Sequence, residues 1–132
     1  MKFKKLAALA LAAVTVMATA MPSYAAWTMT ADGNQYYNYD NTGALCQNNW
    51  VLDYDGDWVA LDSDGWLLKN IWIYSFNGNW YYVDGTGAMI KNGDFNVPLS
   101  YCYYNMQQGK YVYNAIDAGV YNFAADGHHT FA

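Results

Sequence analysis

Tryptophan residues recur in pairs along this chain, and the faces of their rings could bind a ligand. Trp50 precedes Trp58, and Trp72 precedes Trp80, by eight positions in each case. An aromatic face attracts a cation electrostatically by about 0.5 to 2 kcal/mol, and it suits a quaternary ammonium group, which cannot donate a hydrogen bond. Sugar rings also stack on tryptophan faces. The pairs therefore indicate a site for an organic cation or for a carbohydrate, and they do not separate the two.

The tryptophan pairs belong to a repeated unit of 22 residues. Six residues of the segment 49–70, NWVLDYDGDWVALDSDGWLLKN, recur in the segment 71–92, IWIYSFNGNWYYVDGTGAMIKN, each exactly one period later. These residues are Trp50, Gly56, Trp58, Asp62, Gly65 and Lys69. A fixed period of this size is typical of repeat arrays and solenoids. The sequence therefore predicts three repeats over residues 26–95, followed by a degenerate repeat and a C-terminal cap over residues 96–132.

Each repeat carries the signals of a β-hairpin. Asp-Gly or Asn-Gly stands between two aromatic-rich runs at Asp32-Gly33, Asp55-Gly56 and Asn77-Gly78. This dipeptide favours a type I′ turn, in which both central residues have positive φ. A second turn, at Ser63-Asp64-Gly65 and Gly85-Thr86-Gly87, leads to the next hairpin. We therefore predict an all-β fold, a β-solenoid of stacked hairpin repeats of about 22 residues each.

Residues 1–25 have the pattern of a cleavable signal peptide. Lys2, Lys4 and Lys5 precede the apolar run 6–20, and Ser23-Tyr24-Ala25 supplies the small residues of a cleavage site. A membrane anchor is the alternative, but an apolar run of this length is short for a span of about 20 residues. We expect an exported protein with no membrane segment after cleavage.

Charge and motif content exclude several functions. All six cations are lysines and three of them lie in the predicted signal peptide, whereas all eleven acidic residues are aspartates. Such an acidic chain has no basic stripe for nucleic acid. It also lacks a nucleophile–histidine constellation, a phosphate loop and a zinc motif, so we expect no enzyme and no cofactor. Asp62 and Asp84 recur at one place in the repeat, which marks them as turn residues.

The best-preserved repeat carries a family resemblance. The segment IWIYSFNGNWYYVDGTGAMIKNG, from Ile71 to Gly93, resembles the cell-wall-binding repeat of choline-binding and glucan-binding proteins of Gram-positive bacteria. The match is good from Trp27 to Phe95 and weak beyond it. The resemblance implies a β-solenoid whose aromatic cages, between successive hairpins, hold the choline of teichoic acids, or glucan or another cell-surface glycan. Carried over by position, it implies one cage of Trp50, Trp58 and Tyr81 and a second of Trp72, Trp80 and Tyr103.

These expectations combine into a secreted, cell-wall-associated protein that binds a surface polymer without catalysis. Three rings give only a few kcal/mol, or roughly millimolar affinity, so retention requires several sites on one polymer. The alternative is an adhesin-type repeat protein in which the same aromatic residues serve only as core. An open C-terminal end also leaves homodimerisation as an alternative to a monomer.

Three other features give weaker signals. Asp53, Asp55 and Asp57 alternate as in calcium loops, but their glycine comes too early for an EF-hand, so we favour a hairpin turn and expect no metal. His128-His129 has no companion ligand in the sequence. Cys46 and Cys102 are 56 positions apart, which places them about 25 Å apart in a hairpin stack, against the ~7 Å limit of a disulfide. We expect no intrachain disulfide unless the cap folds back, and intermolecular bonds stay open.

Overall fold

The computed structural model describes residues 26–29, 34–38, 44–53 and 55–131. The predicted signal peptide and the Asp32-Gly33 turn lie outside these residues. Within them the chain has ten strands and no helix, which confirms the all-β prediction, and accordingly it has no helix able to span a membrane. The strands are β1 (Ala26–Met29), β2 (Gln35–Asn38), β3 (Asn49–Leu52), β4 (Trp58–Leu61), β5 (Ile71–Tyr74), β6 (Trp80–Val83), β7 (Gly93–Val97), β8 (Tyr103–Asn105), β9 (Lys110–Val112) and β10 (Gly119–Phe123).

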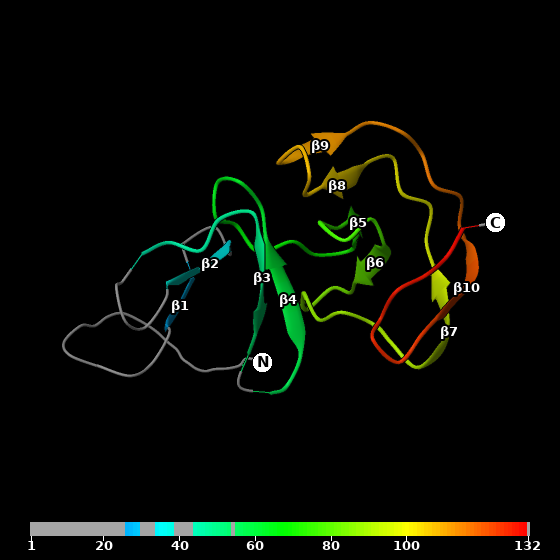
Figure 1. Ribbon diagram of the computed structural model, residues 1–132, viewed down its shortest axis with the longest axis horizontal. Helices are drawn as coiled ribbons and strands as arrows, with labels where there is room; N and C mark the ends of the chain where they lie inside the picture. The colour runs from blue at the N-terminus through cyan, green and yellow to red at the C-terminus, as the bar shows by residue number, and fades with distance from the viewer. Residues whose placement is uncertain (1–25, 30–33, 39–43, 54, 132) are drawn as a thin grey trace.

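Four antiparallel hairpins follow one another along the molecule (Figure 1). They are β1–β2, β3–β4, β5–β6 and β7–β10, which we call the first to the fourth hairpin. One backbone hydrogen bond recurs between neighbours. Leu67 donates to the carbonyl of Gln35 over 2.7 Å, and Met89 donates to that of Trp58 over 2.8 Å. His129 donates in the same way to the carbonyl of Trp80, over 2.8 Å, so the fourth hairpin joins the third as the third joins the second.

Glycine in the second turn of each unit allows this close stacking. A Cβ added at Gly65 would lie 2.8 Å from Leu45 Cδ2, and one added at Gly87 would lie 2.9 Å from Leu67 Cδ2. Real Cβ atoms do not come so close to their neighbours. Gly127 packs in the same way on Met89, and all three glycines have positive φ. The repeated packing shows that the turn after β10 belongs to a fourth unit.

The turns of the hairpins differ from the prediction in type. Gly56 and Gly78 have φ of 83° and 80°, but Asp55 and Asn77 do not have positive φ. The amide of Gly56 donates to the carbonyl of Asp53, and that of Gly78 to Ser75. In each of these four-residue turns the left-handed glycine is therefore the fourth residue. The prediction of type I′ turns is wrong for these two turns, because the residue before the glycine, at the second central position, does not have positive φ.

Residues 98–118 are inserted between the two strands of the fourth hairpin. Within them, β8 pairs in parallel with β5, Trp72 opposite Tyr103, and then antiparallel with β9, giving the sheet order β6–β5–β8–β9 (Figure 1). Tyr103 therefore lies in the insertion, whereas the fourth hairpin is β7–β10, and its β10 strand supplies Tyr121 at the place of Tyr81. The ranges 26–95 and 96–132 stay a prediction as domain boundaries.

Hydrogen bonds hold the insertion on the second hairpin and its turn. The hydroxyl of Tyr111 donates to Asp62 Oδ2 over 2.7 Å, and that of Tyr104 to Asn48 Oδ1 over 2.7 Å. Burial and the Asp62 carboxylate raise the pKa of Tyr111 well above its ordinary value of 10.0, so the hydroxyl remains a donor. Asp62 Oδ1 also accepts the amides of Asp64 and Trp66, which confirms its role as a turn residue.

The core consists of three clusters spread along the hairpins. One lies in the second hairpin around Val51, Val59 and Leu61, one lies under β5, β6 and β8, and the third lies where the third and fourth hairpins meet. Cys46 is part of the first cluster, whereas Cys102 packs against the second. Both are thiols, in separate parts of the fold.

Candidate ligand-binding site

The two tryptophans of the second hairpin share one face of their ribbon. Trp50 on β3 lies opposite Ala60 on β4, and Trp58 is two residues before Ala60. Side chains alternate between the faces of a strand, so Trp58 projects to the same side as Ala60 and Trp50. Ala60 therefore presents only a methyl group opposite Trp50, and Leu52 lies opposite Trp58.

A cavity of about 360 Å³ lies at this face. Its lining residues are Asn49, Trp50, Trp58, Ser75, Asn77, Tyr81, Met89 and Asp126. The volume is within the range of small-molecule sites, roughly 300 to 1,000 Å³. Trp58 keeps 41% of its surface exposed, whereas Trp50 is half-buried. The structure therefore brings all three residues of the first predicted set, Trp50, Trp58 and Tyr81, to one open cavity.

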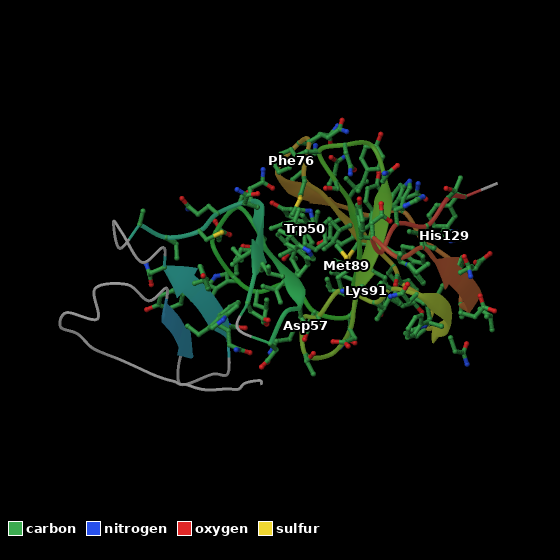
Figure 2. The ribbon with its side chains drawn as sticks, turned by 60° about the horizontal axis from the view of Figure 1, so that its bottom comes forward. Trp50, Asp57, Phe76, Met89, Lys91 and His129 are labelled. Carbon is green, nitrogen blue, oxygen red and sulfur yellow. The ribbon has the colours of Figure 1, made fainter. Side chains whose placement is uncertain are left out.

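The four main walls of this cavity come from two hairpins. Trp50 and Trp58 belong to the second, and Tyr81 and Met89 belong to the third and its second turn. Figure 2 shows Trp50 and Met89 near each other in the middle of the molecule. We call these four residues the open cage. Sequence reasoning missed Met89, although the segment from Ile71 to Gly93 that carries the family resemblance contains it.

Hydrogen bonds at the ring edges fix two of these walls. Trp50 Nε1 donates to Ser75 Oγ over 2.9 Å, and Asn77 Nδ2 donates to the hydroxyl of Tyr81 over 2.8 Å. The two rings meet edge to face, with centroids 5.4 Å apart and planes at 69°. Pre-oriented walls need no reordering when a ligand enters, which lowers the entropic cost of binding.

A carboxylate also lines the cavity. Asp126, in the turn after β10, has 64% of its side-chain surface exposed. Its Oδ1 accepts the amide of His128 over 3.1 Å and lies 2.5 Å from His128 Nδ1. These contacts hold the pKa of the Asp126 carboxyl below its ordinary value, so it is negative at neutral pH. The 22-residue period gave no signal for Asp126, because the insertion precedes it.

The second predicted set lies in a different environment. Trp80 and Tyr103 are adjacent, with ring centroids 4.8 Å apart, but Trp72 has 0% of its surface exposed. Tyr82, opposite Trp72 in the β5–β6 ribbon, packs edge to face against it at 5.5 Å. Tyr121 contacts Trp72 at 5.0 Å, as Tyr81 contacts Trp50. Ligand binding by Trp72, Trp80 and Tyr103 stays a prediction.

The other polar groups singled out in the sequence have roles within the fold. Asp53 Oδ1 accepts the amides of Asp55 and Asp57, each over 3.0 Å, as in a hairpin turn. The carboxylates of this acidic group lie within 4.8 Å of one another. His129 Nδ1 lies 2.8 Å from the carbonyl oxygen of Asn122, whereas the His128 ring meets Asp126. The two histidines thus contact different partners.

Comparison with known proteins identifies the fold of the chain. No protein-family model and no curated protein matches the chain. Among solved structures, the choline-binding domain of a Streptococcus pneumoniae protein matches with a TM-score of 0.50 and 24% identity, over 80% of this chain and 93% of that one. The chain has the fold of a choline-binding domain. The sequence resemblance is thereby confirmed for the fold.

Two larger proteins also match this chain over part of their length. The modular autolysin of Streptococcus pneumoniae matches 80% of this chain with 24% identity and a TM-score of 0.42, but the match spans 25% of the autolysin. Truncated alternansucrase from Leuconostoc mesenteroides matches 79% of this chain with 21% identity and a TM-score of 0.44, over 10% of the enzyme. Both are enzymes, and the similar region is a small share of each.

Proposed function

We propose that this protein binds choline groups of a cell-surface polymer, such as a teichoic acid, in the open cage formed by Trp50, Trp58, Tyr81 and Met89, and that it does so without catalysis. The observation that carries this proposal is one cavity lined by three aromatic rings, a thioether and a carboxylate. A trimethylammonium group matches this set, because it is bulky, positively charged and unable to donate hydrogen bonds.

The carboxylate favours the cation over the neutral glycan. Three aromatic rings attract a quaternary ammonium by cation–π interactions and stack equally well on a sugar. Asp126 adds a negative charge at the cavity, which attracts choline and gives a glucan no charge to pair with. We therefore favour choline over glucan as the ligand.

The arrangement of the chain supports attachment to a wall polymer. The same backbone bond and glycine contact link successive hairpins, as expected of a β-solenoid that presents sites along its length. The pattern of residues 1–25 supports export through a signal peptide. A single cage of this kind binds at roughly millimolar affinity, so firm attachment needs a second site that engages the same polymer.

Titration of the full chain with choline and with isomaltotriose tests this function through tryptophan fluorescence. We expect choline to change the fluorescence at millimolar concentration and isomaltotriose to leave it unchanged. Trp58→Ala should weaken choline binding by at least about ten-fold, because it removes the most exposed wall. Trp80→Ala, the equivalent change in the third hairpin, is the matched control and should retain wild-type affinity.

Each other outcome contradicts a specific part of the proposal. Equal choline affinity in Trp58→Ala and the wild type would exclude the open cage. A response to isomaltotriose alone would replace choline by a glucan. A response to neither compound would favour the adhesin-type protein.

A further inference from the structure

Phe131 lies among the rings of the third and fourth hairpins. The centroid of its ring is 5.1 Å from that of Trp72, 5.4 Å from that of Trp80 and 5.9 Å from that of Tyr121. The imidazole of His129 is 4.6 Å away. The phenyl ring of Phe131 therefore contacts four aromatic side chains, all at the junction of the third and fourth hairpins.

These four residues are the structural counterparts of the open cage. Trp72 and Trp80 follow Trp50 and Trp58 by one period of 22 residues. The equivalence of the others comes from backbone bonds, since His129 donates to Trp80 as Met89 donates to Trp58. Tyr121 contacts Trp72 edge to face at 5.0 Å, which matches the Tyr81–Trp50 contact at 5.4 Å. We call Trp72, Trp80, Tyr121 and His129 the closed cage.

Phe131 thus takes in the closed cage the place that a ligand would take in the open one. It contacts the counterparts of Trp50, Trp58 and Tyr81 at distances suited to ring packing, 5.1 to 5.9 Å between centroids. The phenyl ring itself remains 38% exposed, so it lies at the mouth and not beneath the walls. Figure 2 shows the neighbouring His129 on the side of the molecule away from the first two hairpins.

The position of Phe131 allows it to leave without breaking the hairpin. The bond that fixes this segment, from the amide of His129 to the carbonyl of Trp80, precedes Phe131 in the chain. Withdrawal of the ring therefore costs ring contacts and leaves the backbone pairing intact. It would uncover Trp72, whose indole Nε1 is buried without a hydrogen-bond partner.

We propose that Phe131 is an internal plug that occupies the closed cage, and that its removal creates a second site for a quaternary ammonium ligand between Trp72, Trp80 and Tyr121. This inference rests on the proposed function, because it assigns the same ligand class to the second cage. The segment after β10 sets how many ligand sites the chain offers. A wall polymer meets one open site while the plug is in place and two when it is displaced.

Counting the choline molecules bound per chain tests the plug. Equilibrium dialysis with labelled choline should give one site for the wild type and two for Phe131→Ala. Phe95→Ala is the matched control, since Phe95 is also a phenylalanine of the fourth hairpin, with 36% of its surface exposed and its ring 6.0 Å from that of Phe123. It should keep one site. A single site in Phe131→Ala overturns the plug and leaves the proposed function intact.

The double variant Trp58→Ala/Phe131→Ala separates the two sites. It should bind one choline, in the closed cage, although Trp58→Ala alone loses binding. Absence of binding by this double variant, when the wild type binds, overturns the inference. Binding by Phe131→Ala when the wild type binds no choline would instead contradict the open cage and support the second site.

A second measurement guards against a variant that fails to fold. Phe131→Leu keeps an apolar side chain over Trp72 and should give a second site of weaker affinity. In this variant, saturating choline should shift the indole N–H resonance of Trp72, which stays unshifted in the wild type. An unshifted Trp72 resonance in folded Phe131→Leu overturns the proposal.

Discussion

The second and third hairpins carry the same tryptophan pair in the same register, yet one pair lines a cavity and the other is packed. In both ribbons the two indoles lie on one face, eight residues apart. The residue opposite the first indole differs, because Ala60 lies opposite Trp50 whereas Tyr82 lies opposite Trp72. Ala60 presents only a methyl group, whereas the ring of Tyr82 packs edge to face against Trp72, with centroids 5.5 Å apart.

A second difference concerns the edges of the indoles. Trp50 Nε1 donates to Ser75 Oγ, and one period later the corresponding residue is Val97, which offers no acceptor. Accordingly Trp72 Nε1, like the hydroxyl of Tyr82, is buried without a hydrogen-bond partner in the described structure. The recurring residues thus fix the backbone of each unit, while the residues between them decide whether a cage is open.

Removing the first tryptophan of each pair should give the largest effects, and the loss of stability should differ between the two hairpins. Trp72→Ala deletes a fully buried indole that contacts five aromatic neighbours, so the free energy of unfolding should fall by about 3 to 5 kcal/mol. Trp50→Ala deletes a half-buried ring and should cost about 2 kcal/mol less, while it abolishes choline binding. Urea unfolding measures both, and equal losses of stability would show that Trp50 is also a core residue.

The sequence could predict the parts of the fold that repeat. The period located the hairpins and brought Trp50, Trp58 and Tyr81 to one place, because identical units stack in one manner. Asparagine also recurs with this period, at 48, 70 and 92, each with φ of 50° to 62° before a strand. Asparagine tolerates this left-handed conformation better than most residues.

What does not repeat could not be predicted in the same way. The insertion pairs β8 in parallel with β5, a long-range contact that no local pattern encodes. It moves the aromatic residue of the fourth hairpin from the expected Tyr103 to Tyr121. Asp126 and Phe131 follow the insertion, so their places in the two cages depend on tertiary structure and not on the period.

Ser75→Val gives the open cage the residue type that the closed cage has at the corresponding position, Val97. The substitution leaves the half-buried Trp50 indole N–H without its acceptor, and the free energy of unfolding should fall by about 1 kcal/mol. Ser75→Thr is the matched control, because it keeps a hydroxyl and should stay near wild-type stability. Thermal unfolding followed by circular dichroism distinguishes them. Equal stability of Ser75→Val and Ser75→Thr would mean that this hydrogen bond does not hold the wall.

The smallest expected effect on choline affinity comes from the Asp126 carboxylate, which lines the open cage. Asp126→Asn removes one negative charge from the open cage and should weaken choline binding about two-fold, as for an exposed ion pair of about 0.5 kcal/mol. Asp117→Asn, an exposed aspartate outside the cavity, is the control for net charge and should leave the affinity unchanged.

The pH dependence of binding tests the same charge. The amide and ring of His128 hold the pKa of Asp126 below its ordinary value of 3.8, so this carboxylate stays charged from neutral pH to about pH 5. Its contribution to choline affinity should therefore disappear as pH falls through the lowered pKa. The two-fold difference between the wild type and Asp126→Asn should vanish with it. A difference that persists when the carboxyl is protonated would assign the effect of Asp126 to its shape and not to its charge.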